Sequence, residues 1–524
     1  MASEDSEKSP VEQKTGLDKE IPVSSGASRD LDQAYRFLQQ YGESGESAQA
    51  SAAELKRIRW KVDLYIIPIM FVCYTMQFID KVSLNYAAVM GLNKDLKLKG
   101  NNFSNAATAF FIAYLIAEVP TGYILNKISA PKWLALNVTL WGISTACTAA
   151  ARDYKTLLAA RIFLGIFEAA IAPCLVLISS QWYTKSEQAP RFCIWYSGLG
   201  LGQIIGGLVS FGFQHVKNPD FTGWKAMFVV LGAVTCVAGI ATYFIIPDSP
   251  MKARFLTEKE KAALLKHVSC NQTGVINTSF KMAHIIETLL DVQIWFMTII
   301  TTLISVSSGV VTTYSATLIK SFGYSAPRSA LLNMPSGAVS IISTVVIGFA
   351  IRYKMYRSVG IVACCIPGII GGALLSFAPE HNQGALLAGI YLVNSIVPTL
   401  IVIYQWLASN VAGSTKRSVS AALVTASFSI GNIIGPQTFQ AKDAPRYIPA
   451  KIAVLATQAC GAVLAICLLG YYIWENKRRD RVAAQNSQAL PVSEDTTLSQ
   501  TTSAEQKKWD NLTDKENLTF RYVY

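Results

Sequence analysis

Residues 63–84 read DLYIIPIMFVCYTMQFIDKVSL. Between Asp63 and Asp80 this segment carries no charge. As a helix it is long enough to cross a hydrocarbon core about 30 Å thick, because a helix rises about 1.5 Å per residue. Eleven comparable stretches follow, and the full set of predicted spans is 63–84, 105–125, 133–150, 157–179, 192–213, 224–246, 292–319, 329–351, 359–377, 385–407, 418–438 and 452–473. The sequence therefore predicts an all-α, multi-pass membrane protein.

The spans form two sets of six, and their short basic loops repeat at a constant distance. The loop 126–132 lies about 226 residues before the loop 352–358, and 184–191 lies equally far before 410–417. Two six-helix bundles in parallel repeat are the plan of the major facilitator fold. The expected domains are a disordered cytosolic tail at 1–55, a bundle at 56–247, a cytosolic connector at 248–290, a second bundle at 291–474 and a cytosolic tail at 475–524.

The connector carries a signal for the start of a helix. In Thr257-Glu-Lys-Glu260 a threonine precedes a glutamate by three residues, which is the capping-box pattern. It predicts a short amphipathic helix through about His267. Residues 1–55 and 482–510 are low in apolar content and are expected to be disordered.

Composition agrees with a membrane location. The chain is 51% hydrophobic and 15% charged, whereas soluble chains carry about 25% charged residues. The net charge is +12, but the basic residues lie at the ends of spans. We therefore expect them to set the orientation of the chain in the lipid bilayer, and we expect no nucleic-acid binding. Their bias places both termini in the cytosol. The sequon Asn102-Phe-Ser104, in the first outward loop, makes Asn102 a candidate glycosylation site.

Ionisable residues within the spans are few. Each one near the bilayer centre costs about 3 kcal/mol on insertion scales, so each requires a reason. They are confined to the first half of the chain and are Asp80, Lys81, Glu118, Arg161 and Glu168. Recognition of a charged ligand, and any coupling to protons, is therefore expected in the first bundle.

Arg161 and Glu168 lie seven residues apart, so on one helix they point the same way about 10 Å apart. In the functional interpretation Arg161 grips a substrate carboxylate with two parallel hydrogen bonds. Glu168 then binds and releases the proton, with Asp80 as a second proton-coupling candidate. In the structural interpretation Arg161 pairs with Asp80 to lock the bundle and Glu168 bonds to a hydroxyl.

Lys81 belongs to a polar stripe. Tyr74, Gln77, Lys81 and Asn85 recur at spacings of three and four on one helix face, which must face a bundle or a watery cavity. Tyr74, Gln77 and Lys81 are therefore substrate-binding candidates. Alternatively, the Lys81 side chain extends to the lipid headgroups.

Two further polar residues are candidates in other spans. Asn394, in the tenth span near Pro398, suits an uncharged part of a ligand. Glu118 precedes Pro120 near the inner end of the second span. It could help to close the cytosolic gate by pairing with the loop after the fourth span, or it could be a structural cap.

The sequence shows no metal-ligand cluster, phosphate-binding loop or nucleophile paired with a base. We therefore expect no catalytic residues, no metal and no cofactor, and an enzyme is excluded as the main interpretation.

Several motifs resemble one family in particular. The run Arg161-Ile-Phe-Leu-Gly-Ile-Phe-Glu168 is similar to the fourth-span signature of the anion:cation symporter branch of the major facilitator superfamily. The chain resembles the fungal allantoate permease family more closely still. The segments that carry this resemblance are Ile79-Asp-Lys-Val82, Pro247-Asp-Ser-Pro250, Asn410-Val-Ala-Gly-Ser-Thr-Lys-Arg417, Asp443-Ala-Pro-Arg-Tyr447, Asp514-Lys-Glu-Asn517 and Phe520-Arg-Tyr522.

The resemblance implies proton-linked movement of small organic anions and vitamins. It also implies that Arg161 binds substrate and that Glu168 couples protons. The chain departs from the family at Lys81, where relatives usually have arginine, and at Ser83, where asparagine is usual. A lysine offers a point charge in place of a planar fork, so a bidentate grip at position 81 is not expected.

The resulting hypothesis is a monomeric plasma-membrane symporter that brings a small organic anion into a fungal cell together with a proton. A vacuolar membrane is the alternative location. The alternative functions are a proton-antiport exporter of a secondary metabolite or drug, and a nutrient sensor with little transport.

Overall fold

The computed structural model describes Phe37 and residues 50–125, 127–216, 221–269, 281–353, 355–379, 381–444, 446–488, 512–517 and 519–524. Nearly all of the predicted N-terminal tail and most of the stretch 482–510 lie outside these residues. The described part of the chain consists of helices and their connections and contains no strand.

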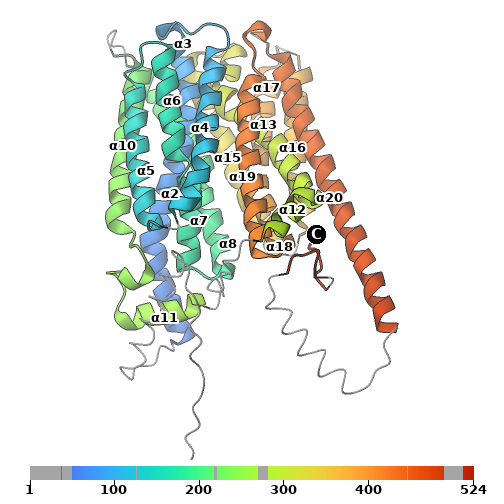
Figure 1. The fold of residues 1–524 in the computed structure, drawn as a ribbon. Coiled ribbons are helices and arrows are strands. Elements are labelled where there is room, and N and C mark those ends of the chain that lie inside the picture. Colours follow the sequence, from blue (N-terminus) through green and yellow to red (C-terminus); the bar gives the residue numbers. More distant parts are fainter. Residues whose placement is uncertain are drawn as a thin grey trace, which may run out of the picture.

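The helices form two groups that stand side by side (Figure 1). The first half contains α2 (Ala52–Met90), α3 (Leu92–Asp95), α4 (Asn102–Ile124), α5 (Ala130–Thr148), α6 (Tyr154–Glu168), α7 (Ile171–Trp182), α8 (Lys185–Tyr196), α9 (Gly198–Phe213) and α10 (Gly223–Ile245). The connector contains η1 (Pro250–Lys252), α11 (Glu258–Ser269) and α12 (Met282–Leu290). The second half contains α13 (Val292–Ser321), α14 (Ala326–Leu332), α15 (Met334–Arg352), α16 (Arg357–Phe377), α17 (Gln383–Val393), η2 (Asn394–Ile396), α18 (Thr399–Asn410), α19 (Ser414–Gln437), η3 (Ala441–Asp443) and α20 (Ile448–Gln488).

Eleven helical segments of the described residues are long and apolar enough to cross a membrane. The predicted third span, α5, is outside this set, but it packs between α10 and α6 within the first group. Counting α5, the two groups hold six spans each, as predicted. The largest differences from the expected bounds are in the first and last spans: α2 begins at Ala52, because Ser51 and Glu54 form a capping box, and α20 continues to Gln488.

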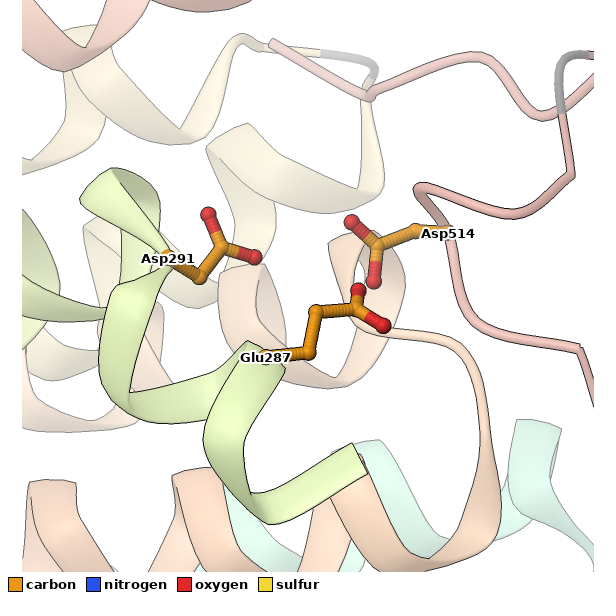
Figure 2. A group of neighbouring side chains, drawn as sticks. All are labelled: Glu287, Asp291 and Asp514. Atoms are coloured by element: carbon orange, nitrogen blue, oxygen red, sulfur yellow. The ribbon is translucent and has the colours of Figure 1, made fainter. Parts of the chain in front are cut away.

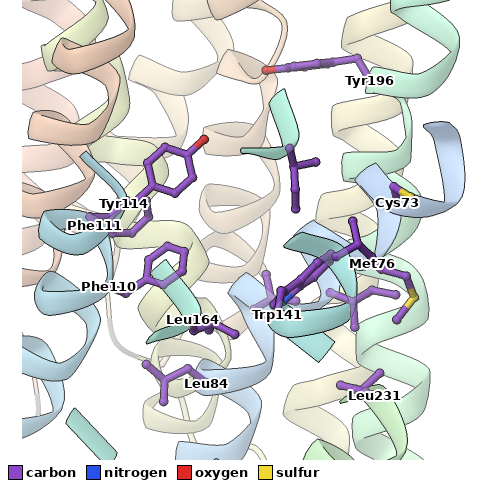
Figure 3. Packing of buried hydrophobic residues seen from close by; sticks show 14 of the residues in the cluster. Cys73, Met76, Leu84, Phe110, Phe111, Tyr114, Trp141, Leu164, Tyr196 and Leu231 are labelled. Atoms are coloured by element: carbon purple, nitrogen blue, oxygen red, sulfur yellow. The ribbon is translucent and has the colours of Figure 1, made fainter. Parts of the chain in front are cut away.

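The core of the first half is built where α2, α5, α6 and α10 meet (Figure 3). Met76, Trp141, Leu164 and Leu231, one from each helix, belong to one buried cluster. Trp141 is fully buried. Side chains from four helices thus fix the positions of α2 and α6, which carry most of the charged candidates.

Prolines interrupt one span in each half at matching positions. A proline inside a helix has no N–H to donate and collides with the carbonyl four residues earlier. Pro173 accordingly follows a break at Ala169 and Ala170 between α6 and α7, and Pro398 follows the 3₁₀ turn η2 between α17 and α18. The fourth and tenth spans are therefore both discontinuous, at equivalent places in the two halves.

The two halves are in contact on the face that carries α3, which we call the opposite face (Figure 1). The face that carries α11 and residues 512–517 and 519–524 is the connector face. On the opposite face the ring of Tyr314 stacks on Phe439 with centroids 4.0 Å apart. The Tyr314 hydroxyl lies 2.5 Å from Ser104 Oγ of the first half. Thr108 and Asn105 of α4 both receive hydrogen bonds from Gln437 of α19. These contacts close the opposite face.

Tyr314→Ala is expected to open the opposite face. It removes the hydrogen bond to Ser104 and the edge-on contact with Phe103, both of which cross between the halves. Together they are worth about 1–3 kcal/mol, so the open population should rise about tenfold. The measurement is the rate at which a membrane-impermeant maleimide labels Thr108→Cys, a residue that is buried while the face is closed. An unchanged rate in the Tyr314→Ala background would show that the contacts of Tyr314 with α4 do not hold the face shut.

On the connector face, α11 is fastened to the first half. Thr257 and Glu260 form the predicted capping box, and Lys61 of α2 donates to Glu260 at 2.6 Å. Glu187 of α8 receives Arg59 at 2.6 Å and lies 3.1 Å from His267 of α11. Glu260 thus joins α11 to α2, and Glu187 joins both of these helices to α8.

Glu187→Gln is expected to destabilise the folded protein by about 1–3 kcal/mol, the usual range for losing charged hydrogen bonds. Burial opposes the charged form, but hydrogen bonds from His267, Thr184 and Arg59 outweigh it and lower the pKa of Glu187 to about 2, from an ordinary value of 4.5. The wild-type advantage should therefore be complete above pH 4.5 and shrink as the pH falls toward 2.

The measurement is thermal unfolding of both proteins in detergent between pH 3 and pH 7. Glu258→Gln is the matched control, because its side chain is 65% exposed and pairs only with its helix neighbour Lys261. Equal shifts for the two variants would contradict an anchoring role for Glu187.

Candidate functional site

A cavity of about 680 Å³ lies between the two halves. Its walls come from α2, α4, α7, α8 and α9 of the first half and from α13, η2, α18 and α19 of the second. The lining includes Leu125 and Phe192, which lie at the connector-face ends of their spans. Because the opposite face is closed, the cavity is reached from the connector face.

Most of the predicted binding residues line this cavity. Tyr74, Gln77 and Lys81 lie along its α2 wall, and Asn394 lies on the η2 wall. The hydroxyl stripe of α13 supplies Thr301, Ser305, Ser308 and Thr312 to the same space. The cavity lining therefore offers one ammonium group, from Lys81, one carboxylate, from Glu118, and many uncharged hydrogen-bonding groups.

Lys81 forms an ion pair with Glu168. Its Nζ atom lies 3.2 Å from Glu168 Oε1 and 5.7 Å from the centre of the Tyr114 ring. Glu168 is fully buried, and Lys81 is the cation paired with its carboxylate among the described residues. A buried carboxylate with so few partners is costly as an anion. The arrangement suits a group that alternates between pairing with a cation and carrying a proton.

Arg161 and Asp80 form a second, looser pair behind the cavity wall. Arg161 Nη1 lies 3.9 Å from Asp80 Oδ2, and Thr145 donates to Asp80 Oδ1 at 2.9 Å. Both charged side chains are about 4% exposed, and neither residue lines the cavity. The pairing of Arg161 with Asp80 corresponds to the structural interpretation of the sequence. A direct grip of Arg161 on substrate stays a prediction, and in this conformation it would require Arg161 to leave Asp80.

The discontinuous spans position equivalent residues of the two repeats at the site. Glu168 is the last residue of α6, and Asn394 is the first residue of η2. They are 226 residues apart, the same offset that separates the repeated loops. In transporters of this plan, substrate and ion sites lie at the repeat interface and are formed by interrupted helices. The first repeat thus contributes a carboxylate where the second contributes an amide.

Aromatic side chains form the connector-face part of the first-half wall. Tyr74 meets Trp195 edge-on with centroids 4.7 Å apart and lies 5.4 Å from Tyr196. Phe192 packs on Trp195 at 4.2 Å. Across the cavity, Tyr404 of α18 bonds to Thr425 of α19 at 3.0 Å. These rings can hold the apolar part of a ligand whose charged group reaches Lys81.

Two further candidates, Glu118 and Asn102, both belong to α4. Glu118 faces the cavity from α4, whereas Arg191, in the basic loop that it was expected to meet, forms a two-pronged pair with Asp63 at 2.6 Å. A gating role for Glu118 stays a prediction. Asn102 is the first residue of α4, and the Ser104 hydroxyl of its sequon is buried against Tyr314, so glycosylation there also stays a prediction.

Sequence reasoning missed the pairing of Lys81 with Glu168 and the symmetry of the two broken spans. The pairing joins α2 to α6, and no local spacing reports it. The symmetry was readable, because Pro173 and Pro398 lie 225 residues apart, within one residue of the repeat offset.

Comparison with known proteins agrees with this geometry. A family model described as Major Facilitator Superfamily matches residues 70–436. The chain is 37% identical to the thiamine pathway transporter THI73 of Saccharomyces cerevisiae, over 96% of each protein. It is 32% identical to the allantoate permease of the same yeast, over 92% of this chain and 89% of the permease.

Among solved structures, the fold resembles that of a D-xylose-proton symporter. The TM-score is 0.60 at 15% sequence identity, over 77% of this chain and 97% of the symporter. At that identity the likeness concerns the fold alone.

Proposed function

Because the chain belongs to the major facilitator superfamily and, within it, to the allantoate permease family, we propose that this secondary transporter imports a small organic anion together with a proton. Family membership makes the protein a multi-pass membrane transporter and not an enzyme. The cargo, the coupling ion and the direction of transport are the proposal. The observation that carries it is the ion pair between Lys81, in the cavity wall, and the buried carboxylate Glu168.

Competition for Lys81 couples the proton to the anion. While Glu168 is ionised, it neutralises Lys81, and a substrate carboxylate gains little by entering. When Glu168 takes a proton, Lys81 is left as an uncompensated cation in a cavity with low dielectric, and a carboxylate replaces the lost partner. Proton and anion therefore bind together and leave together. Asp80 and Arg161 neutralise each other behind the wall, so this second pair adds no net charge to the site.

The charge balance predicts electrical neutrality for the simplest cargo. A monoanion that moves with one proton carries no net charge across the membrane. A second proton would make transport respond to voltage by about 2.3 kcal/mol per 100 mV. Uptake at imposed pH and voltage distinguishes these stoichiometries.

Alternating access follows from the fold. The closed opposite face and the cavity reached from the connector face describe one end state, and rocking of the halves would produce the other. With the basic bias placing the connector face and both termini in the cytosol, this end state is inward-open. We propose the plasma membrane as its location and a monomer as the working unit.

The test is a competition screen in transport-null yeast at external pH 5 and pH 7. Radiolabelled allantoate is the first probe, and unlabelled carboxylates, vitamins and neutral analogues are the competitors. We expect at least one carboxylate to be taken up faster at pH 5 and to be displaced by other anions but not by its own amide. Uptake that is independent of pH for every cargo found would refute the coupling. Extrusion of accumulated compounds instead of uptake would favour an exporter.

A further inference from the structure

The described end of the chain, residues 512–517 and 519–524, lies across the connector face of the second half, and we call these residues the C-terminal strap. In Figure 1 it lies beside α12 and α18 and near α20. The strap forms no helix. It includes two motifs that the resemblance identified, Asp514–Asn517 and Phe520–Tyr522, and the transport mechanism gives neither of them a role.

Helix side chains bind the strap backbone in pairs. Asn410 of α18 accepts from the Val523 N–H at 2.7 Å and donates to the Val523 carbonyl at 2.9 Å. Asn476 of α20 makes the same two bonds with Tyr522, both at 2.9 Å. Such paired bonds satisfy donor and acceptor together, as a neighbouring strand would. The asparagines form a site that fits an extended peptide.

An ion pair between Lys416 and Asp514 holds the other end of the strap. Lys416 is fully buried, and its Nζ atom lies 2.8 Å from Glu287, 2.6 Å from Asp291 and 2.7 Å from Asp514. Figure 2 shows these three carboxylates facing one another. The ammonium group of Lys416 lies within bonding distance of all three, so the cluster is a site for a lysine and not for a metal. Burial raises the pKa of Tyr522, which stays protonated and donates to Asp514 at 2.7 Å.

The helices joined here also control access to the cavity. Asp291 caps the start of α13, and Lys416 is in the first turn of α19. At their far ends α13 carries Tyr314 and α19 leads into Phe439, the stacked pair that closes the opposite face. Asp514 of the strap therefore binds the connector-face ends of the two helices whose other ends hold that face shut.

We propose that the C-terminal strap is a built-in peptide ligand of the second half that makes α13 and α19 move as one body and stabilises the state with a closed opposite face. By linkage, a ligand that favours one state shifts the balance toward it when bound and away from it when released. Binding of the strap thereby regulates the transport cycle. This role of the strap rests on the proposed rocking of the two halves but not on the identity of the cargo, so an experiment can contradict one without the other.

The test uses the full chain with a specific protease site inserted after residue 500 and with Thr108→Cys as the reporter on the opposite face. After cleavage of the folded carrier, retention of the strap is followed by gel filtration, and opening is followed by maleimide labelling. Asp514→Asn with Tyr522→Phe alters only the strap and leaves the helices unchanged. Thr519→Ala is the matched control, because this exposed side chain bonds only within the strap.

We expect the parent and Thr519→Ala carriers to retain the cleaved strap and to label slowly. The double variant should lose the strap and label at least fivefold faster. Excess synthetic peptide of residues 512–524 should restore slow labelling, which excludes a folding defect. Loss of the strap from the parent on cleavage, or loss from the variant without faster labelling, would overturn the proposal. Retention by the double variant would overturn the role of Asp514.

Discussion

Replacing Glu168 with glutamine is expected to abolish proton-driven accumulation of the cargo and to leave its exchange across the membrane intact. Glutamine has nearly the shape of a protonated glutamate but cannot release a proton, so Lys81 stays available to an anion throughout the cycle. A gradient of one pH unit is worth about 1.4 kcal/mol and supports about tenfold accumulation when one proton accompanies each cargo molecule. The variant should reach a ratio of one.

The measurement uses proteoliposomes loaded with the carboxylate that the competition screen selects. Net accumulation is followed under an imposed pH gradient, and exchange is followed with cargo on both sides and no gradient. Glu118→Gln is the matched control, because it neutralises the carboxylate that lines the cavity and leaves the pair of Lys81 with Glu168 in place. If accumulation is lost in Glu118→Gln but kept in Glu168→Gln, Glu118 and not Glu168 is the residue that carries the proton. Loss of exchange as well in Glu168→Gln would indicate a structural role.

The fold was predictable because membrane spans depend on local properties. Length and apolar content locate most spans without knowledge of their neighbours. Only α5 falls short, since its start contains Lys132 and its length leaves little margin. The constant offset between basic loops then supplied the two-bundle plan. The capping box at Thr257 predicted the start of α11 for the same local reason.

The site was predictable by residue type but not by contact. The spacing of Arg161 and Glu168 correctly placed both on one face of the fourth span, and both face α2. Whether α2 presents Asp80 or Lys81 to each of them depends on the packing of two helices, which no spacing within one helix determines. The result is that Lys81, the residue that departs from the family pattern, is the cation in the cavity wall.

The C-terminal strap could not be predicted from composition. Its residues are mostly polar, and such segments are usually disordered because they bury too little apolar surface. Here Asp514, Tyr522 and the strap backbone find buried partners from distant helices. A segment of low hydrophobicity can therefore be ordered when the partner surface presents a buried lysine to its carboxylate and asparagine side chains to its backbone.

Lys81→Met is expected to lower the apparent affinity for the cargo by about 10- to 100-fold. A charged hydrogen bond to a carboxylate is worth about 1.5–3 kcal/mol, and the upper figure corresponds to about two factors of ten. Methionine keeps most of the side-chain volume and removes the cation. Since Lys81→Met also strands Glu168 without its partner, the double variant with Glu168→Gln separates loss of binding from loss of folding: it should unfold at a temperature close to that of the wild type and still fail to bind. Lys81→Arg should retain binding, because the charge persists.

The decisive comparison is Arg161→Gln, measured beside Lys81→Met by the half-saturation concentration for exchange. If Arg161→Gln alone weakens binding, the guanidinium behind the wall is the anion ligand after all, and it must leave Asp80 during the cycle.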